Sequence, residues 1–221
     1  MKAVAYPQHY YEQWHQACAR TERNHFDKTS SRLPPTTRFQ RGQDESFPRE
    51  TEKGVLECFR LKVVYDREKT GFEDDREMPI VINEVLAGRF QIVSVLGQAQ
   101  FSKAIEVRDL TSSSQKQRYC IKMINNKKED LDQALDEVKI LRYIKNNCDT
   151  DATCLLTFHE CFYHREHLML LTELLKENLF EASKANPGYF TLPRIQAVGK
   201  QVATALSTLH RLKVIHCDLK P

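Results

Sequence analysis

A lysine inside an apolar strand constrains this chain more than any other sequence feature. Residues 119–124 read Tyr-Cys-Ile-Lys-Met-Ile, so apolar residues flank Lys122 on both sides. An ammonium group in such a place requires a counter-ion or a bound phosphate. A lysine at the end of an apolar strand is often only a solvated end residue, so the prediction depends on finding a partner for Lys122.

A helix predicted just downstream offers that partner. Apolar residues recur at spacings of four and three over residues 131–144, which is typical of an amphipathic helix. Glu137 lies on it, with Asp136 next to it as a competitor and a solvated helix face as the plain alternative. A second helix is predicted after Thr191, a plausible N-cap with Pro193 in the first turn. Its apolar stripe is Ile195, Val198, Val202, Leu206 and Leu209.

Short segments rich in β-branched and apolar residues predict the strands. From residue 90 onward, the expected order is three strands, a helix, two strands and then a largely helical region. The predicted strands are 58–65, 80–82, 90–96, 103–107, 119–124, 155–163 and 167–173, the last two forming a hairpin.

Composition limits the class of protein. The 221 residues are 41% hydrophobic, enough for one compact domain plus an extra segment. The net charge of +3 comes without a basic stripe, so no nucleic-acid partner is expected. With no signal sequence or long apolar run, no membrane association is expected, and seven scattered cysteines favour a cytoplasmic or nuclear location. Residues 1–55 lack apolar periodicity over most of their length and are predicted to be disordered.

Five motifs in order give the chain its resemblance to a family. Residues 96–104 are similar to the glycine-rich loop G-x-G-x-x-G-x-V, although Gly97 is the only one of its three glycines. Residues 119–122 resemble V-A-I-K, and Glu137 begins an E-x-x-x-L segment. Residues 173–179 follow E-L-L-x-x-N-L, and 216–221, His-Cys-Asp-Leu-Lys-Pro, are similar to H-R-D-L-K-P. The chain thus resembles dual-specificity tyrosine-regulated (DYRK) protein kinases of the CMGC group, most of all their plant and protist members.

The resemblance implies a protein-kinase-like α+β fold: a five-stranded antiparallel N-lobe with helix C, joined to the first helices of the C-lobe. It divides the chain into a disordered segment (1–55), a DYRK-type N-terminal extension (56–88), the kinase N-lobe (89–172) and the hinge with the start of the C-lobe (173–221). It also implies that the sequence stops inside the catalytic loop.

Roles for single residues follow from the same resemblance. Asp218 would orient the substrate hydroxyl and accept its proton, and Lys220 would neutralise charge on the transferred phosphate. Lys122 would bind the α- and β-phosphates, with Glu137 as the residue that fixes it. The gatekeeper would be Thr172. The residues expected at the nucleotide are Leu96, Gly97, Gln98, Ala99, Gln100, Phe101, Ser102, Ala104, Lys122, Thr172, Glu173, Leu175 and Asn178.

The implied function is phosphorylation of protein serine and threonine residues with ATP, with tyrosine autophosphorylation an option of the full-length enzyme. ATP and Mg²⁺ are the implied cofactors, and the Mg²⁺ ligands are expected beyond Pro221. The chain alone is therefore expected to be inactive. Most kinases carry at this position an arginine that clamps a phosphorylated activation loop. Cys217 stands there instead, as a cysteine does in the DYRK branch, and the absence of the arginine puts that form of control in doubt.

Two other classes of function remain open. A non-catalytic, nucleotide-binding pseudokinase is favoured by the glycine-poor loop and by the early end. A zinc site is suggested by a cluster of cysteines and histidines, but these lack a C-x₂-C pair and most fall on the predicted hairpin, so no metal site is expected. The cluster is Cys148, Cys154, His159, Cys161, His164 and His167.

Overall fold

The computed structural model describes residues 50–51, 54–69, 77–112 and 117–221. Most of the segment predicted to be disordered lies outside these residues. Within it, β1 (Glu50–Thr51) and β2 (Gly54–Val55) pair as two short antiparallel strands. The chain divides into two compact units, and the main sheet belongs to the one made of residues 1–5 and 61–221.

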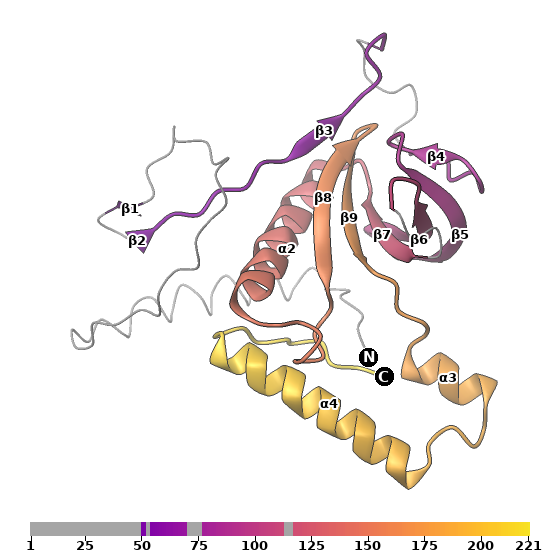
Figure 1. The fold of residues 1–221 in the computed structure, drawn as a ribbon, viewed down its shortest axis with the longest axis vertical. Coiled ribbons are helices and arrows are strands. Elements are labelled where there is room, and N and C mark those ends of the chain that lie inside the picture. Colours follow the sequence, from indigo (N-terminus) through magenta and orange to yellow (C-terminus); the bar gives the residue numbers. More distant parts are fainter. Residues whose placement is uncertain (1–49, 52–53, 70–76, 113–116) are drawn as a thin grey trace. The chain divides into compact units, whose positions relative to one another are not determined.

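Seven strands form this sheet, in the order β3-β8-β9-β7-β6-β5-β4 (Figure 1). The five strands expected for the kinase-like lobe are β5 to β9, and all of their pairings are antiparallel, so the five-stranded prediction is confirmed. The bounds are β3 (Lys62–Val64), β4 (Val85–Leu86), β5 (Phe90–Gln98), β6 (Ser102–Asp109), β7 (Arg118–Ile124), β8 (Phe158–His164) and β9 (His167–Glu173).

The extension before residue 89 adds the two outer strands. β3 runs parallel to β8 and covers only residues 62–64 of the predicted strand 58–65. The extended segment predicted at 80–82 is not a strand, because the chain turns there: the Glu84 N–H donates to the Val81 carbonyl at 3.2 Å, and Asn83 has a φ of 72°. Pairing begins after this turn, where β4 meets the start of β5.

Alternation along the strands separates two faces of the sheet. On one face, side chains such as Ile105, Ile121, Met169 and Leu171 are almost fully buried in the main core. On the other face, Lys122 lies between Ile121 and Met123 in sequence but points the opposite way. The alternation therefore places the charged Lys122 side chain on one face of the sheet and the main hydrophobic core on the other.

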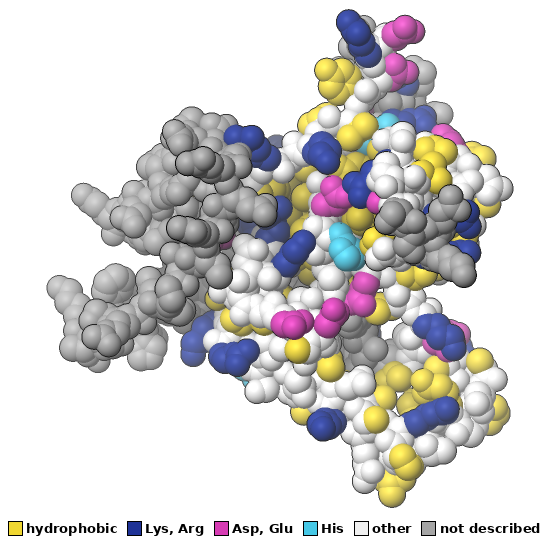
Figure 2. Space-filling view, viewed as in Figure 1, with side chains coloured by type: hydrophobic (Ala, Val, Ile, Leu, Met, Phe, Trp, Pro, Cys, Tyr) yellow, Lys and Arg dark blue, Asp and Glu magenta, His cyan; other side chains and the backbone are white. Residues whose placement is uncertain are grey.

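Three helices complete the described chain: α2 (Lys128–Asn147), α3 (Leu179–Ala185) and α4 (Leu192–Arg211). Helix α2 packs on β7, β8 and β9. In the described part of the chain, neither α3 nor α4 packs closely on another helix or strand, and apolar side chains including Phe180, Leu192 and Ile195 are exposed there (Figure 2). None of the helices that the structure describes has the length and apolarity needed to cross a membrane.

Candidate active site

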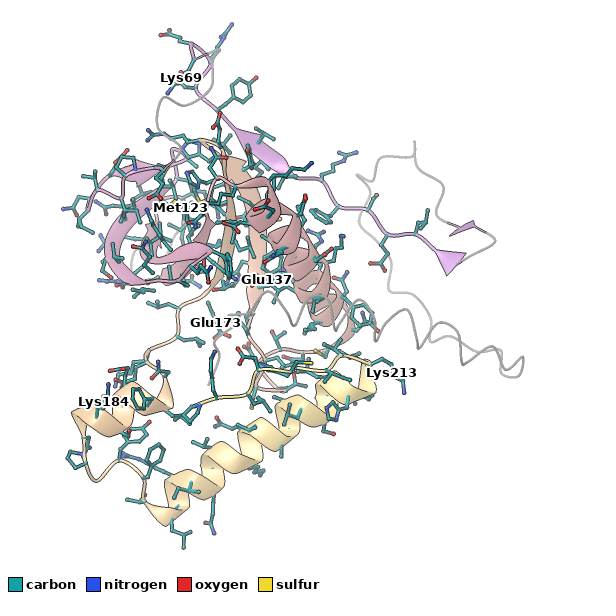
Figure 3. The ribbon with its side chains drawn as sticks, turned by 180° about the vertical axis from the view of Figure 1, so that it is seen from behind. Lys69, Met123, Glu137, Glu173, Lys184 and Lys213 are labelled. Atoms are coloured by element: carbon teal, nitrogen blue, oxygen red, sulfur yellow. The ribbon has the colours of Figure 1, made fainter. Side chains whose placement is uncertain are left out.

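Lys122 and Glu137 form an ion pair between β7 and α2. The Lys122 ammonium donates to both carboxylate oxygens of Glu137, at 2.9 and 2.6 Å. The exposed fraction is 25% for the Lys122 side chain and 14% for that of Glu137. A half-buried cation is thus fixed in one place by two hydrogen bonds, and removal of either partner would leave a poorly solvated charge. Figure 3 labels Glu137 on the helix.

The buried face of α2 explains why Glu137, and not its neighbour, reaches the lysine. Ala134, Val138 and Leu141 are buried at helical spacing, so they define the side of the helix that meets the sheet. Glu137 lies next to Val138 at the border of that face. Asp136 instead accepts from Lys139 at 2.6 Å on the solvent side. The structure therefore separates the two acids that the sequence left in competition.

Thr172 lies on the same face of the sheet as Lys122. Cys120 is two residues before Lys122 and therefore shares its face, and Cys120 pairs with Thr172 across β7 and β9. The exposed fraction of Thr172 is only 8%. Burial raises the pKa of the Cys120 thiol, which keeps this part of the face uncharged. Between the lysine and the end of β9, this face therefore carries the uncharged Cys120 and Thr172 side chains.

At the end of β9, the backbone of Glu173 is partly used by the fold. Its N–H donates to the Thr157 carbonyl at 3.0 Å, and its carboxylate accepts from the Thr157 N–H at 2.8 Å. The Glu173 carbonyl accepts from the Thr172 hydroxyl at 3.2 Å. Leu175 follows in a half-buried segment that is neither helix nor strand.

Asn178 has a structural task in addition to the nucleotide contact expected for it. It is the N-cap of α3, where its side-chain oxygen accepts from the Glu181 N–H at 2.7 Å. This oxygen satisfies one of the free N–H groups of the first turn. The amide nitrogen of the same side chain is the group left to face a ligand.

The predicted phosphate-covering loop is the tight connection between β5 and β6. Leu96, Gly97 and Gln98 belong to the end of β5, with Gly97 paired to Ala104 on β6. The connection is closed by the Ala99 N–H, which donates to the Ser102 carbonyl at 2.8 Å. A Cβ atom on Gly97 would meet nothing within 4 Å, so sterics do not demand glycine there.

Asn125 contacts the tip of this loop, and the sequence analysis missed it. Its side-chain amide donates to the Gln100 carbonyl at 3.0 Å, and its backbone N–H donates to the Phe101 carbonyl at 3.1 Å. The available signal was an amide side chain directly after a predicted strand. That signal is weak, because it does not reveal which loop lies beside the strand end.

The segment after α4 brings Asp218 and Lys220 together. The Lys220 ammonium donates to the Asp218 carboxylate at 2.9 Å. The Asp218 N–H donates to the carbonyl of His216 at 2.9 Å and to its Nδ1 at 3.2 Å. Cys217 between them has a φ of 61°, the left-handed conformation that permits this close turn. A carboxylate and a cation are thus presented side by side.

The zinc alternative finds no support among the described residues, where no three His, Cys, Asp or Glu side chains are placed to hold a metal ion. Two of the candidate histidines already bond to the backbone: His164 to the Val64 carbonyl at 2.8 Å and His167 to the Ile124 carbonyl at 2.6 Å.

Comparison with known proteins now decides the family. Residues 90–221 match the model of the protein kinase domain. This chain belongs to the protein kinase family. A crystallised kinase domain shares the fold, with a TM-score of 0.60 and 24% identity over 66% of this chain and 42% of that one. The predicted kinase-like α+β fold is confirmed.

Curated relatives of this kinase chain are DYRK proteins. The DYRK-family kinase pom1 of Schizosaccharomyces pombe is 36% identical over 68% of the chain and 14% of its own length. The probable serine/threonine-protein kinase dyrk2 of Dictyostelium discoideum is 36% identical over 68% of the chain and 16% of its length. Mouse dual specificity tyrosine-phosphorylation-regulated kinase 3 is 28% identical over 84% of the chain and 31% of its own length. The resemblance to the DYRK family is confirmed, and the chain spans less than a third of the length of these relatives.

Proposed function

We propose that the protein carrying this chain transfers the γ-phosphoryl group of ATP to serine and threonine hydroxyls of proteins. The observation that carries the proposal is the Lys122 ammonium held by both carboxylate oxygens of Glu137. A cation fixed in this way is preorganised for the α- and β-phosphates and needs little rearrangement during phosphoryl transfer.

Asp218 and Lys220 supply the other end of the reaction. In our proposal, Asp218 orients the substrate hydroxyl and accepts its proton as the hydroxyl oxygen bonds to the γ-phosphorus. The bond from that phosphorus to the β–γ bridging oxygen breaks, and its electron pair leaves with ADP. Lys220, 2.9 Å from the carboxylate, neutralises charge on the phosphoryl group.

The adenine would lie toward the end of β9. The proposal assigns the buried Thr172 as gatekeeper and uses the Glu173 carbonyl, because the Glu173 N–H is occupied by the Thr157 carbonyl. Leu175 would provide a backbone contact and Asn178 a contact to the ribose. Dual-specificity relatives also support tyrosine autophosphorylation in the full-length protein.

Two neighbouring acids on α2 provide a matched test. The Glu137→Gln substitution removes the charge that fixes Lys122, whereas Asp136→Asn removes one that pairs with Lys139. We expect kcat/KM for ATP, measured by peptide phosphorylation in the protein that carries this chain, to fall about 100-fold for Glu137→Gln. Asp136→Asn should stay within about twofold of the parent protein. Equal losses in the two variants would contradict the proposal.

A non-catalytic nucleotide-binding protein is the second candidate, favoured by a loop in which Gly97 is the only glycine. Peptide phosphorylation, measured together with ATP binding, separates the enzyme from the non-catalytic binding protein. The binding function replaces the enzymatic one under two conditions. The protein binds ATP, and Glu137→Gln weakens that binding. No serine, threonine or tyrosine is phosphorylated, either in the peptide or in the protein itself.

A further inference from the structure

The tip of the β5–β6 loop is held by one residue from outside the loop. The Asn125 side chain donates to the Gln100 carbonyl at 3.0 Å, and the Asn125 backbone N–H donates to the Phe101 carbonyl at 3.1 Å. Asn125 directly follows β7, the strand that carries Lys122. Two consecutive carbonyls of the loop therefore point toward the end of the strand that bears the phosphate-binding lysine.

This hold also sets the direction of two loop N–H groups. In a trans peptide unit, the carbonyl of one residue and the N–H of the next point in opposite directions. With the carbonyls of Gln100 and Phe101 turned toward Asn125, the N–H groups of Phe101 and Ser102 are turned away from it. Backbone N–H groups fixed in a loop are good donors to phosphate oxygens.

Asn125 is connected to helix α2 as well. Its carbonyl accepts from the N–H of Lys127, the N-cap residue of α2, at 2.8 Å. Its side chain also lowers the pKa of Asp130, whose exposed fraction is 6% and whose pKa is raised mainly by burial. Asp130 and Glu137 are seven residues apart, about two helical turns, so they lie on the same side of α2. The loop tip, Asn125 and the helix that fixes Lys122 thus form one connected set of contacts.

We propose that Asn125 is a positioning residue that holds the β5–β6 loop over the phosphates of the bound nucleotide. The inference rests on the proposed function, in which those phosphates lie at Lys122. Ala99 and Ser102 stand where the family motif has glycines, so this loop has fewer backbone conformations with which to adapt to phosphate. A loop that adapts less has to be held in the productive position beforehand, and the Asn125 amide does this.

The neighbouring asparagine gives a matched control. The Asn126 side chain donates to Glu166 at 2.7 Å, in the β8–β9 turn, and not to the loop. Asn125→Ala and Asn126→Ala would be compared in the protein that carries this chain, by measuring Kd for ATP and for adenosine by isothermal titration calorimetry. Adenosine occupies the adenine end without phosphates, so its Kd also reports whether each variant is folded.

We expect Asn125→Ala to raise Kd for ATP about fivefold, the loss of one hydrogen bond, with Kd for adenosine within about twofold of the parent value. Asn126→Ala should change neither. The proposal is overturned if Asn125→Ala leaves Kd for ATP unchanged or weakens both ligands equally. In those cases the parent protein still binds ATP and the proposed function stands. If the parent binds neither ligand, both proposals fail together.

Discussion

Among single residues, the buried Asp109 shows how charge is stabilised in this lobe. Its carboxylate accepts from the Arg89 guanidinium, with one bond of 2.6 Å, and from the N–H and hydroxyl of Thr111 at 2.9 and 2.7 Å. The bond from Arg89 is the main cause that lowers the pKa of Asp109 to about 2. Arg89 also pairs with Glu160 on β8, so the Asp109 carboxylate, through Arg89, helps to join β6 to β8.

We predict a loss of stability in acid that depends on Asp109. In the unfolded chain an Asp carboxyl titrates near pH 3.9, so the stabilisation is complete above about pH 4 and is lost as the pH falls toward about 2. Urea titrations between about pH 5 and 2.5 would give the free energy of unfolding, which should fall as the pH falls. Asp109→Asn should reduce this fall by at most about 2 kcal/mol over the whole range. The exposed Asp132, changed to Asn, should keep the parent slope, and identical slopes in all three proteins would contradict this account.

Sequence reasoning at this scale found the residues that a local pattern marks. Lys122 stood out because its apolar neighbours leave an ammonium without solvent, and the helical stripe placed Glu137 near the buried face. Asn125 could not be found in this way, because its partners Gln100 and Phe101 reach it only when the β5–β6 hairpin folds back. A single polar contact between segments distant in sequence leaves no periodic trace in either segment.

Among the elements, one buried histidine joins the N-terminal extension to the sheet. The His167 ring, with an exposed fraction of 3%, donates from Nδ1 to the Ile124 carbonyl at 2.6 Å and accepts at Nε2 from the Met78 N–H at 3.2 Å. Only the neutral ring can make both bonds, because a protonated Nε2 cannot accept from the Met78 N–H, whereas the donation from Nδ1 survives protonation. Burial is the main cause that lowers its pKa, with Lys103 acting in the same direction and Glu166 and Glu77 opposing it.

We predict that the joint at Met78 opens in mild acid. A histidine in the unfolded chain binds a proton near pH 6.5, whereas folded His167 binds one only at a lower pH. The contribution of His167 to the free energy of unfolding is therefore complete above about pH 6.5 and declines below it. Amide hydrogen exchange at Met78, corrected for the intrinsic effect of pH, should be faster at about pH 5.5 than at about pH 7.5. In His167→Gln, which has no ring to protonate, the corrected rates should match, and a pH-dependent rate in that variant would refute the assignment.

Elements with a clear period were predicted well. The segments rich in β-branched and apolar residues gave β5 to β9, and the 3.6-residue period gave α2 and α4, with differences only at their ends. Thr191 is the N-cap residue of α4 as predicted, but its side chain makes no cap hydrogen bond. The short strands of the extension were misplaced because β3 and β4 are fixed by their partners β8 and β5, and not by their own sequence.

For the molecule as a whole, the extension matters because its strands pair with part of each edge of the kinase sheet, β3 with residues 162–164 of β8 and β4 with residues 90–91 of β5. A kinase lobe built from β5 to β9 alone would leave β8 as an edge strand, and β8 contains the buried Phe158, Cys161 and Phe162. Exposed apolar edge strands pair with other chains. Here β3 occupies that edge, and Lys62 adds an ion pair to Glu160 on β8 at 3.7 Å.

Two deletions test whether this edge strand keeps the sheet from self-association. Removing residues 1–55 leaves β3 in place, whereas removing residues 1–66 takes away β3, the Lys62 ion pair and the Val64 carbonyl that bonds to His164. The longer deletion should expose Phe162 and the unpaired backbone of β8, so its mass in multi-angle light scattering should rise with concentration and its urea midpoint should fall. The shorter deletion should match the intact chain in both measurements. If both deletions behave like the intact chain, β8 tolerates an open edge, and the parallel pairing with β3 adds little to the stability of the lobe.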